Sequence, residues 1–558
     1  MPVLTGALPE TCERPQFMPI PTLITAFLAS GGFYLLAPYV FVVNSIPWGL
    51  PPTPAELSAI VQSTQVPRVS ASTDEVSPVA RAFAEQDPGP WRQTGKGHAP
   101  RVLLAKLEVG KDLPEVNEYL QSLEPWSVPG STWELNEGDY DFTETVLIRI
   151  LYRFGDRPDR LYPDTLKHLL DTLLVGEGGH PTLKVPRTFG LVFDTENHIL
   201  MTESSRYLKN QWIFSHGDAR RKFDNARNGL QEWLLGRLNQ IRCHGFHEFN
   251  SVPYESYALI ALLNLETFAQ PPELAALARA IIDDAVYRRA IASMDFRACI
   301  PFRRQPEHAG DTRLDIYSLN ALVAAWTGQP FGRRAQDRAL DAFMSRYRPP
   351  AESVALFHAK PREYFVQVGH GAYGSPEIIS GGPDYVLSAG GACPDAESQV
   401  VPRPTTLLLP DGPEDLDRSF HIPGAGDWLQ WNNTGVYRRF ACGNRPVHVP
   451  RQYRPAAEAV HWKVFEFAFS GRLLLAVWSS DEFGLMALFP DATMAAAELL
   501  ETLKTANPDA DALLRTFRWP DGTKLTYDVH APYGAWVMQS AAETPLERDY
   551  GAWPLIQE

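Results

Sequence analysis

Three adjacent residues with different acid–base chemistry, Glu196, Asn197 and His198, stand at the start of a predicted helix. They combine a carboxyl group, an amide and an imidazole, which are groups that transfer protons or stabilise charge. Asp194 or Thr195 is the predicted N-cap, so the three side chains fall in the first helical turn. In the alternative interpretation, Glu196 and Asn197 only cap the helix and His198 packs locally.

A second polar run, which contains His247, Glu248, Asn250 and Tyr254, precedes another apolar segment with helical character. Ser251 is the predicted N-cap of this second helix. Two polar helix starts, each followed by an apolar helix, favour a shared cleft at one end of a helical array.

The composition is that of a folded, multidomain protein. The chain has 558 residues, of which 44% are hydrophobic and 21% charged. This length predicts at least two domains. The net charge of −15 argues against a nucleic-acid-binding protein, which carries a basic face. It does not argue against an anionic substrate, because a basic cleft can lie in an acidic protein.

The sequence contains no motif that requires a metal or a cofactor. Five cysteines are present without a CxxC pair, and Cys243, His244 and His247 lack a fourth metal ligand nearby. No phosphate-binding loop, dinucleotide fingerprint, His-Glu-x-x-His or Gly-x-Ser-x-Gly motif occurs. We therefore expect neither a metal nor a cofactor.

The N-terminal region predicts export or membrane attachment. A polar tail at 1–18 precedes an apolar stretch at 19–46, and no charged residue occurs from 16 to 55. This stretch is long enough to cross a bilayer. It favours a signal or a single membrane anchor, so we expect an exported protein that is periplasmic, membrane-anchored or secreted. The alternative is a buried apolar hairpin. The oligomeric state stays open.

The rest of the chain predicts an α+β fold with helices before strands. Residues 47–100 are rich in Pro, Ser and Thr and indicate a linker and docking segment. Residues 101–354 show helical periodicity with short loops, which favours paired helices in a toroid. Residues 355–558 contain short strand-like runs and a hairpin turn at 520–523, which favour an antiparallel β-sandwich. One helix is expected there, at 491–505.

The Asn197-His198 pair, the later Tyr254 and this order of domains resemble the polysaccharide lyases built on an (α/α) toroid. Alginate lyases and the heparinase II/III-like group are the similar families. In the alginate lyase pattern an Asn-Asn-His motif precedes a catalytic tyrosine, and Glu196 stands here in place of the first Asn. The segments around 195–198 and 249–251 also resemble uncharacterised bacterial proteins.

The resemblance implies β-elimination on an acidic, uronate-containing polysaccharide. Such a reaction removes a proton next to a carboxylate, so the carboxylate must be neutralised to stabilise the intermediate. Asn197 and an arginine would neutralise it, because a guanidinium pairs with a carboxylate in a bidentate way. His198 would act as base or help to neutralise, and Tyr254 would donate to the leaving oxygen or serve as base. The candidates for substrate binding are Arg187, Arg206, Asn250, Tyr257, Arg303, Arg304 and His370.

Two other functions are compatible with these residues. A glycoside hydrolase on the same toroid needs two carboxyl groups, for which Glu196 and Glu248 are the predicted pair. A non-catalytic, membrane-tethered glycan-binding or assembly protein would use the many aromatic side chains for stacking on sugars. For Arg303 and Arg304 the alternative is a solvated basic turn.

Overall fold

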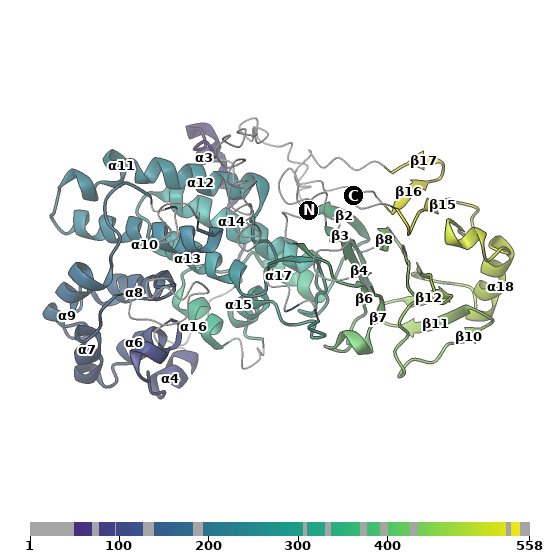
Figure 1. Cartoon of the computed structure of the whole chain (residues 1–558), viewed down its shortest axis with the longest axis horizontal. Helices are drawn as coiled ribbons and strands as arrows, with labels where there is room; N and C mark the ends of the chain where they lie inside the picture. The colour runs from purple at the N-terminus through teal and green to yellow at the C-terminus, as the bar shows by residue number, and fades with distance from the viewer. Residues whose placement is uncertain are drawn as a thin grey trace, which may run out of the picture.

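The structure is a computed structural model with helices in its N-terminal half and antiparallel sheets in its C-terminal half (Figure 1). The predicted order of helices before strands is therefore confirmed. The structure describes residues 49–69, 78–94, 96–125, 139–181, 183, 194–304, 308, 310–329, 336–368, 377–390, 400–423, 434–531 and 537–546.

The helical half consists of helices that match most of the predicted periodic segments. The helices are α3 (Pro54–Ser63), α4 (Pro78–Ala84), α5 (Trp91–Thr94), α6 (His98–Val109), α7 (Leu113–Gln121), α8 (Asp141–Phe154), α9 (Pro163–His168), α10 (Glu196–Ser215), α11 (Asn225–Asn228), α12 (Leu230–His244), α13 (Tyr254–Phe268), α14 (Pro272–Ile291), α15 (Ser318–Thr327), α16 (Gln336–Met344) and α17 (Ala351–His358). Helices α6 to α17 lie within or overlap residues 101–354, so the helical region predicted there is confirmed.

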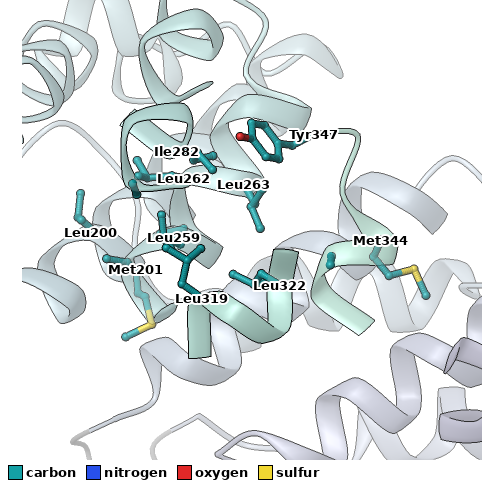
Figure 2. Close-up of a cluster of buried hydrophobic side chains, with 14 of the residues drawn as sticks. Leu200, Met201, Leu259, Leu262, Leu263, Ile282, Leu319, Leu322, Met344 and Tyr347 are labelled. Atoms are coloured by element: carbon teal, nitrogen blue, oxygen red, sulfur yellow. The ribbon is translucent and has the colours of Figure 1, made fainter. Parts of the chain in front are cut away.

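One hydrophobic core joins these helices. Figure 2 shows buried leucine, isoleucine and methionine side chains that α10, α13, α14, α15 and α16 contribute to this core. Leu259, Leu263 and Ile282 are among its fully buried members. In α13, Leu259, Leu262 and Leu263 recur at three- and four-residue spacing, so one face of that helix lies against its neighbours. Packing of α13 against α10 in this core places the first residues of the two helices beside each other.

In its described residues, the stretch predicted as linker and docking segment contains α3, α4, α5 and the first residues of α6. A capping box starts α3, since Thr53 accepts from the Glu56 amide at 3.3 Å and Glu56 accepts from the Thr53 amide at 2.7 Å. Arg68 then forms an ion pair with Asp283 of α14 at 2.8 Å. This stretch therefore packs onto the helical half.

The predicted signal or membrane segment at 19–46 and the tail at 1–18 lie outside the described residues. Within the described ranges, no helix is both long enough and apolar enough to span a membrane.

The described residues of the C-terminal half form three sheets and the α-helix α18 (Ala496–Ala506), and a short strand pair joins this half to the helical half. Strands β2 (Tyr364–Val368), β3 (Glu377–Gly382), β4 (Tyr385–Gly390), β6 (Thr405–Leu408) and β7 (Phe420–Ile422) form the first sheet in that order. The second has the order β10 (Ala457–Glu458), β11 (Trp462–Ala468), β12 (Arg472–Ser479), β13 (Gly484–Phe489), β9 (Phe440–Gly443), β8 (Thr434–Tyr437). The third is β14 (Thr516–Arg518), β15 (Lys524–Tyr527), β16 (Met538–Ala541), β17 (Thr544–Pro545), and β1 (Phe302–Arg303) pairs with β5 (Val400–Val401).

Successive side chains of the first and second sheets point into different hydrophobic cores, so the sheets form layers between those cores. In β2, Val366 and Val368 belong to the core shared with the helices, whereas Phe365 belongs to a core shared with the second sheet. In β12, Leu475 faces that same core, and Leu474 faces a third core formed with α18 (Ala496–Ala506) and the third sheet. Successive strand residues point to opposite faces, so each of these two sheets is buried on both sides.

Two local predictions in this half are confirmed. Strands β14 and β15 pair antiparallel around the predicted turn at 520–523. The helix predicted at 491–505 is α18, which starts at Ala496. The turn residues were therefore sufficient to locate the hairpin, and the amphipathic pattern was sufficient to locate the helix.

Candidate functional site

The starts of α10 and α13 are joined by a hydrogen bond between Asn197 and Glu248. The Asn197 amide nitrogen Nδ2 donates to Glu248 Oε2 at 2.6 Å, and its backbone N–H donates to the same oxygen at 3.0 Å. Nδ2 also donates to Thr195 Oγ1 at 3.0 Å. Residues from the two predicted polar runs therefore lie in contact with each other.

Glu196 lies beneath this contact. Its Oε1 accepts from Arg237 of α12 at 3.0 Å, and its Oε2 accepts from the Glu248 backbone N–H at 3.0 Å. The side chains of Glu196 and Arg237 are each 2% exposed. Because breaking a buried ion pair leaves an unpaired charge, this pair fixes α12 against the start of α10.

Arg304 connects the cluster to Tyr254. One guanidinium nitrogen of Arg304 is hydrogen-bonded to Glu248 Oε1. The guanidinium carbon lies 4.0 Å from the centroid of the Tyr254 ring, within the range of a cation–π contact. Arg304 has a φ of 65°, a left-handed conformation that costs energy in a residue with a Cβ. The chain turns at Arg304 in a way that aims this side chain at Tyr254.

His198 lies among carboxylates from the start of α8. Its Nδ1 is 2.7 Å from Asp141 Oδ2, and its Nε2 is 3.6 Å from Asp139 Oδ1. Burial alone would lower the pKa of His198, but Asp141, Asp194 and Asp139 together raise it to about 10. His198 is therefore an imidazolium at neutral pH, and it is a poor base there.

Tyr257 belongs to the same neighbourhood as His198. The Phe142 ring contacts both, with centroid distances of 5.4 Å to His198 and 4.3 Å to Tyr257. The guanidinium of Arg338 lies 4.3 Å from the Tyr257 ring centroid. Tyr257 follows Tyr254 by one helical turn, so both rings lie on one side of α13.

The two glutamates have opposite protonation tendencies. Burial raises the pKa of Glu196 to about 7, although Arg237 opposes the shift. Burial would also raise the pKa of Glu248, but Arg304 and Asn197 outweigh it and hold that pKa below its ordinary value. Near neutral pH Glu248 is ionised and Glu196 is partly protonated.

Exposure separates the cluster into an accessible part and a buried part. His198, Tyr254, Tyr257 and Arg304 are partly exposed. Three residues are buried: Glu196 is 2% exposed, Asn197 0% and Glu248 2%. Their carboxyl and amide groups therefore bond to other protein groups and are not accessible to a polysaccharide. The accessible part offers a phenol, an imidazolium and a guanidinium. Together they can bind an anion and transfer a proton.

The other predicted substrate-binding residues have different surroundings. Arg206 is ten residues into α10, about 15 Å along the axis from Glu196, and donates to the Glu177 carbonyl at 3.0 Å. Asn250 is buried, accepts from Arg289 at 3.1 Å and donates to Glu377 of β3. Arg303 is 5% exposed in β1, and its backbone N–H donates to the Phe249 carbonyl at 3.1 Å. These three residues hold the structure together.

Two predicted residues, Arg187 and His370, lie outside the described residues.

The predicted helix caps require correction. Thr195 does occupy the N-cap position of α10, but its hydroxyl accepts from the Asn197 side chain rather than capping a backbone amide. The second helix begins at Tyr254, and Pro253 occupies its N-cap position. The chain adopts a φ of 51° at Asn250, so Ser251 lies before the helix and its hydroxyl does not cap it.

Several residues of the site were not identified from the sequence. Arg237 lies 41 positions from Glu196, and its helical segment gives no chemical signal. Asp139 stands just before α8 and Asp141 is its first residue, a position where acidic residues are ordinary features of a helix. Asp194 is predicted from the sequence only as a possible N-cap, and in the structure it helps to raise the pKa of His198.

No group of three or more His, Cys, Asp or Glu side chains suited to a metal ion occurs in the part of the chain that the structure describes. A scan against models of known protein families gave no match, and a search of curated proteins found no relative.

Proposed function

We propose that this chain is a carbohydrate-active enzyme that cleaves an acidic, uronate-containing polysaccharide by β-elimination. The observation that carries the proposal is the stacking of Arg304 on Tyr254 at 4.0 Å, with both side chains partly exposed. A guanidinium next to a phenol combines a group that binds a carboxylate with a group that transfers a proton. His198 contributes a second positive charge close by.

The proposed roles follow from charge and access. Arg304 and His198 neutralise the substrate carboxylate, which stabilises the enolate-like intermediate after the adjacent proton leaves. Tyr254 acts as a phenolate that takes that proton, and the resulting phenol donates the same proton to the leaving oxygen, which restores the phenolate. His198 does not act as the base at neutral pH, because its pKa is raised to about 10 by the surrounding aspartates despite its burial.

Glu248 and Asn197 are positioning residues in this proposal. Glu248 holds the guanidinium of Arg304 over Tyr254 through its Oε1. Asn197 holds Glu248 through a 2.6 Å bond to its Oε2. Tyr257 extends the partly exposed aromatic surface by one helical turn, so it would contact the sugar next to the cleaved bond.

A glycoside hydrolase is the second candidate, and one observation favours it. The pKa of Glu196 is raised by burial to about 7, whereas that of Glu248 is lowered by Arg304 and Asn197 against its burial. An acid and a base of this kind are what hydrolysis requires. Against it, both side chains are 2% exposed, and each of their four carboxyl oxygens accepts a hydrogen bond from the protein. Hydrolysis would require both side chains to leave these contacts.

The finer architecture and the location belong to the same proposal. We take the helical half to be an (α/α) toroid and the sheets to form a β-sandwich, with the site at the starts of α10 and α13. Residues 19–46 would export the protein or anchor it in a membrane, where it would meet a polysaccharide.

A substrate panel tests the proposal. The protein is incubated with uronate-containing and neutral polysaccharides, while ultraviolet absorbance and new reducing ends are measured. New absorbance together with new ends indicates an unsaturated sugar and supports β-elimination. New ends without absorbance indicate hydrolysis. A folded protein that produces neither signal on any polysaccharide of the panel contradicts both candidates.

A further inference from the structure

A second guanidinium–phenol pair lies one helical turn along α13 from the pair of Arg304 and Tyr254. Arg338 of α16 lies over the ring of Tyr257, with 4.3 Å between the guanidinium carbon and the ring centroid. The corresponding distance from Arg304 to the Tyr254 ring is 4.0 Å. Tyr257 follows Tyr254 by three positions, so both lie on one side of α13, about 4.5 Å apart along its axis.

Arg338 differs from Arg304 in the partners of its guanidinium. Arg304 is hydrogen-bonded to Glu248, whereas the Arg338 side chain forms no hydrogen bond within the described part of the chain. Its ion pair with Asp341 spans 3.7 Å, which is longer than a hydrogen bond. Arg338 is 8% exposed, and its guanidinium nitrogens are not completely buried. Its N–H groups are therefore open to an acceptor from outside the protein, and an anion is the strongest acceptor for a guanidinium.

The charges beneath Arg338 also favour an anion. The Asp341 carboxylate is 0% exposed and is shared by three guanidinium groups, at 2.9 Å from Arg101, 3.4 Å from Arg149 and 3.7 Å from Arg338. Within the described residues, Arg149 and Arg338 have no other carboxylate at ion-pair distance. At least one positive charge therefore stays unbalanced, and Arg338 is more exposed than Arg149, which is 1% exposed. An anion bound at Arg338 would balance it, because an uncompensated charge in a protein interior is unfavourable.

The surroundings of Tyr257 connect this pair to His198. The Phe142 ring lies 4.3 Å from the Tyr257 centroid and 5.4 Å from that of His198. His198 holds the nearby aspartates, with Nδ1 at 2.7 Å from Asp141 and Nε2 at 3.6 Å from Asp139. The partly exposed Tyr257 forms no hydrogen bond through its hydroxyl within the described residues. That hydroxyl can therefore donate to or accept from a sugar hydroxyl.

We propose that Arg338 and Tyr257 form a second carboxylate-binding subsite, which takes the sugar next to the one held by Arg304 and Tyr254. The Arg338 guanidinium donates to the carboxylate of that sugar, and the Tyr257 hydroxyl bonds to one of its hydroxyl groups. Two subsites of the same kind, one helical turn apart, fit a chain that carries a carboxylate on each of two neighbouring sugars.

This arrangement narrows the substrate class. The preferred polysaccharide has uronates in contiguous runs, because uronates that alternate with neutral or amino sugars leave one of the two guanidinium groups without a carboxylate. The inference rests on the proposed function and specifies the substrate of that same site.

Equilibrium binding of short oligosaccharides to the full-length protein tests the inference by isothermal titration calorimetry. The probes with contiguous uronates are the trisaccharides of galacturonate and of mannuronate, and the alternating probe is a hyaluronan tetrasaccharide. Parallel titrations of Tyr254→Phe give affinities without cleavage of the probe. We expect one of the trisaccharides to bind at least about tenfold more tightly than the tetrasaccharide, because it forms a second charge-assisted hydrogen bond.

Two substitutions at Arg338 locate the effect. Arg338→Gln should weaken binding of the preferred trisaccharide about tenfold and bring it close to that of the tetrasaccharide. The fold should survive, because Asp341 keeps Arg101 and Arg149 as partners. Arg338→Lys keeps the charge but not the planar fork, so it should lose only part of the affinity.

Arg157→Gln is the matched control. Arg157 also lies over an aromatic ring, 6.0 Å from the centroid of Phe154, which is the last residue of α8, whereas Phe142 is the second. This variant should leave every affinity unchanged. Equal losses in Arg157→Gln and Arg338→Gln would show a general effect of lost charge and would contradict the subsite.

Three further results would overturn the inference: no binding of either trisaccharide, equal affinities for the trisaccharides and the tetrasaccharide, or trisaccharide binding that is unchanged in Arg338→Gln. Binding is measured without cleavage, so the two proposals can fail separately. Cleavage of a polysaccharide without any role for Arg338 in binding would overturn this inference alone. Binding that depends on Arg338, with no cleavage of any polysaccharide, would overturn the proposed reaction alone.

Discussion

The guanidinium of Arg304 lies 4.0 Å from the ring centroid of Tyr254, although the two residues stand 50 positions apart (304 − 254). Glu248 fixes this contact, since it binds Arg304 through one oxygen and Asn197 through the other. The contact therefore links the start of α10, the start of α13 and the end of β1. It places a positive charge beside the proposed proton-transfer group.

Tyr254→Phe should abolish cleavage while the fold survives. The change removes only the hydroxyl, so the ring keeps its contact with Arg304, and general acid–base catalysis of this kind is worth roughly 10²–10⁴-fold in rate. Initial rates of polysaccharide cleavage measure the effect. Tyr119→Phe is the control, because it removes a hydroxyl that donates to the Gly89 carbonyl at 2.8 Å in the helical half. Equal activity of Tyr254→Phe and wild type would remove Tyr254 from the mechanism.

Arg304→Lys should reduce cleavage at least about tenfold, although the positive charge is retained. A lysine lacks the planar group that stacks on Tyr254 and pairs with a carboxylate in a bidentate way. The loss should appear in both KM and kcat, because the residue binds the substrate carboxylate and stabilises the intermediate. Arg438→Lys is a closely matched control, since Arg438 also has a positive φ, of 49°, and lies 5.9 Å from the ring centroid of Tyr437. Similar losses in the two variants would argue against a specific role.

His198 should make the free energy of unfolding fall as the pH rises from about 7 to 10. Its pKa is raised to about 10 by Asp141, Asp194 and Asp139 against the effect of burial, from an ordinary value of 6.5. The folded state thus binds the proton more tightly, and this stabilisation is fully present below pH 6.5 and lost as the pH rises through the folded pKa. Urea unfolding at a series of pH values measures the slope.

His198→Gln should flatten that slope and lower stability at pH 7, because it leaves the three aspartates without their cation. His216→Gln is the control, because His216 directly follows the last residue of α10 and its exposed pair with Asp156 contributes little to stability. A slope that persists unchanged in His198→Gln would show that another group titrates.

Glu196→Gln should remove part of a second slope, between about pH 4.5 and 7. Burial raises the pKa of Glu196 from 4.5 to about 7, so the folded state again binds the proton more tightly. The stabilisation is complete below pH 4.5 and is lost as the pH rises through 7. A glutamine keeps the shape and an acceptor for Arg237. Unfolding measured at pH 4.5 and pH 7 checks this.

The cleavage activity of Glu196→Gln at pH 7 distinguishes β-elimination from hydrolysis. If β-elimination is correct, Glu196→Gln keeps measurable activity at pH 7, because the buried carboxyl only supports Arg237 and the Glu248 backbone. Loss of all activity with an intact fold would favour hydrolysis by Glu196 and Glu248.

The helical region and the hairpin could be predicted from the sequence, because their local residue patterns match the environment that they have in the fold. The segment 257–268 repeats apolar residues at helical spacing, and it forms α13 within a continuous core. The turn at 520–523 contains Pro, Asp and Gly in the order that favours a hairpin, and β14 pairs with β15 around it.

Contacts between distant segments could not be predicted in the same way. Asn197 and Glu248 were both candidates, but their hydrogen bond depends on how α10 packs beside α13. Arg237 gave no signal, because its helix is defined by leucines and its charge is paired only after folding. Ser251 was expected to cap α13, and the left-handed turn at Asn250 moved the helix start to Tyr254.

The most direct measurement is mass spectrometry of the oligosaccharides released from a uronate-containing polysaccharide. β-Elimination breaks the bond without adding water, so one of the two products of each cleavage should contain a double bond and be lighter by one water molecule than its saturated counterpart. Hydrolysis adds one water molecule at each cleavage, so products that are all saturated would contradict β-elimination.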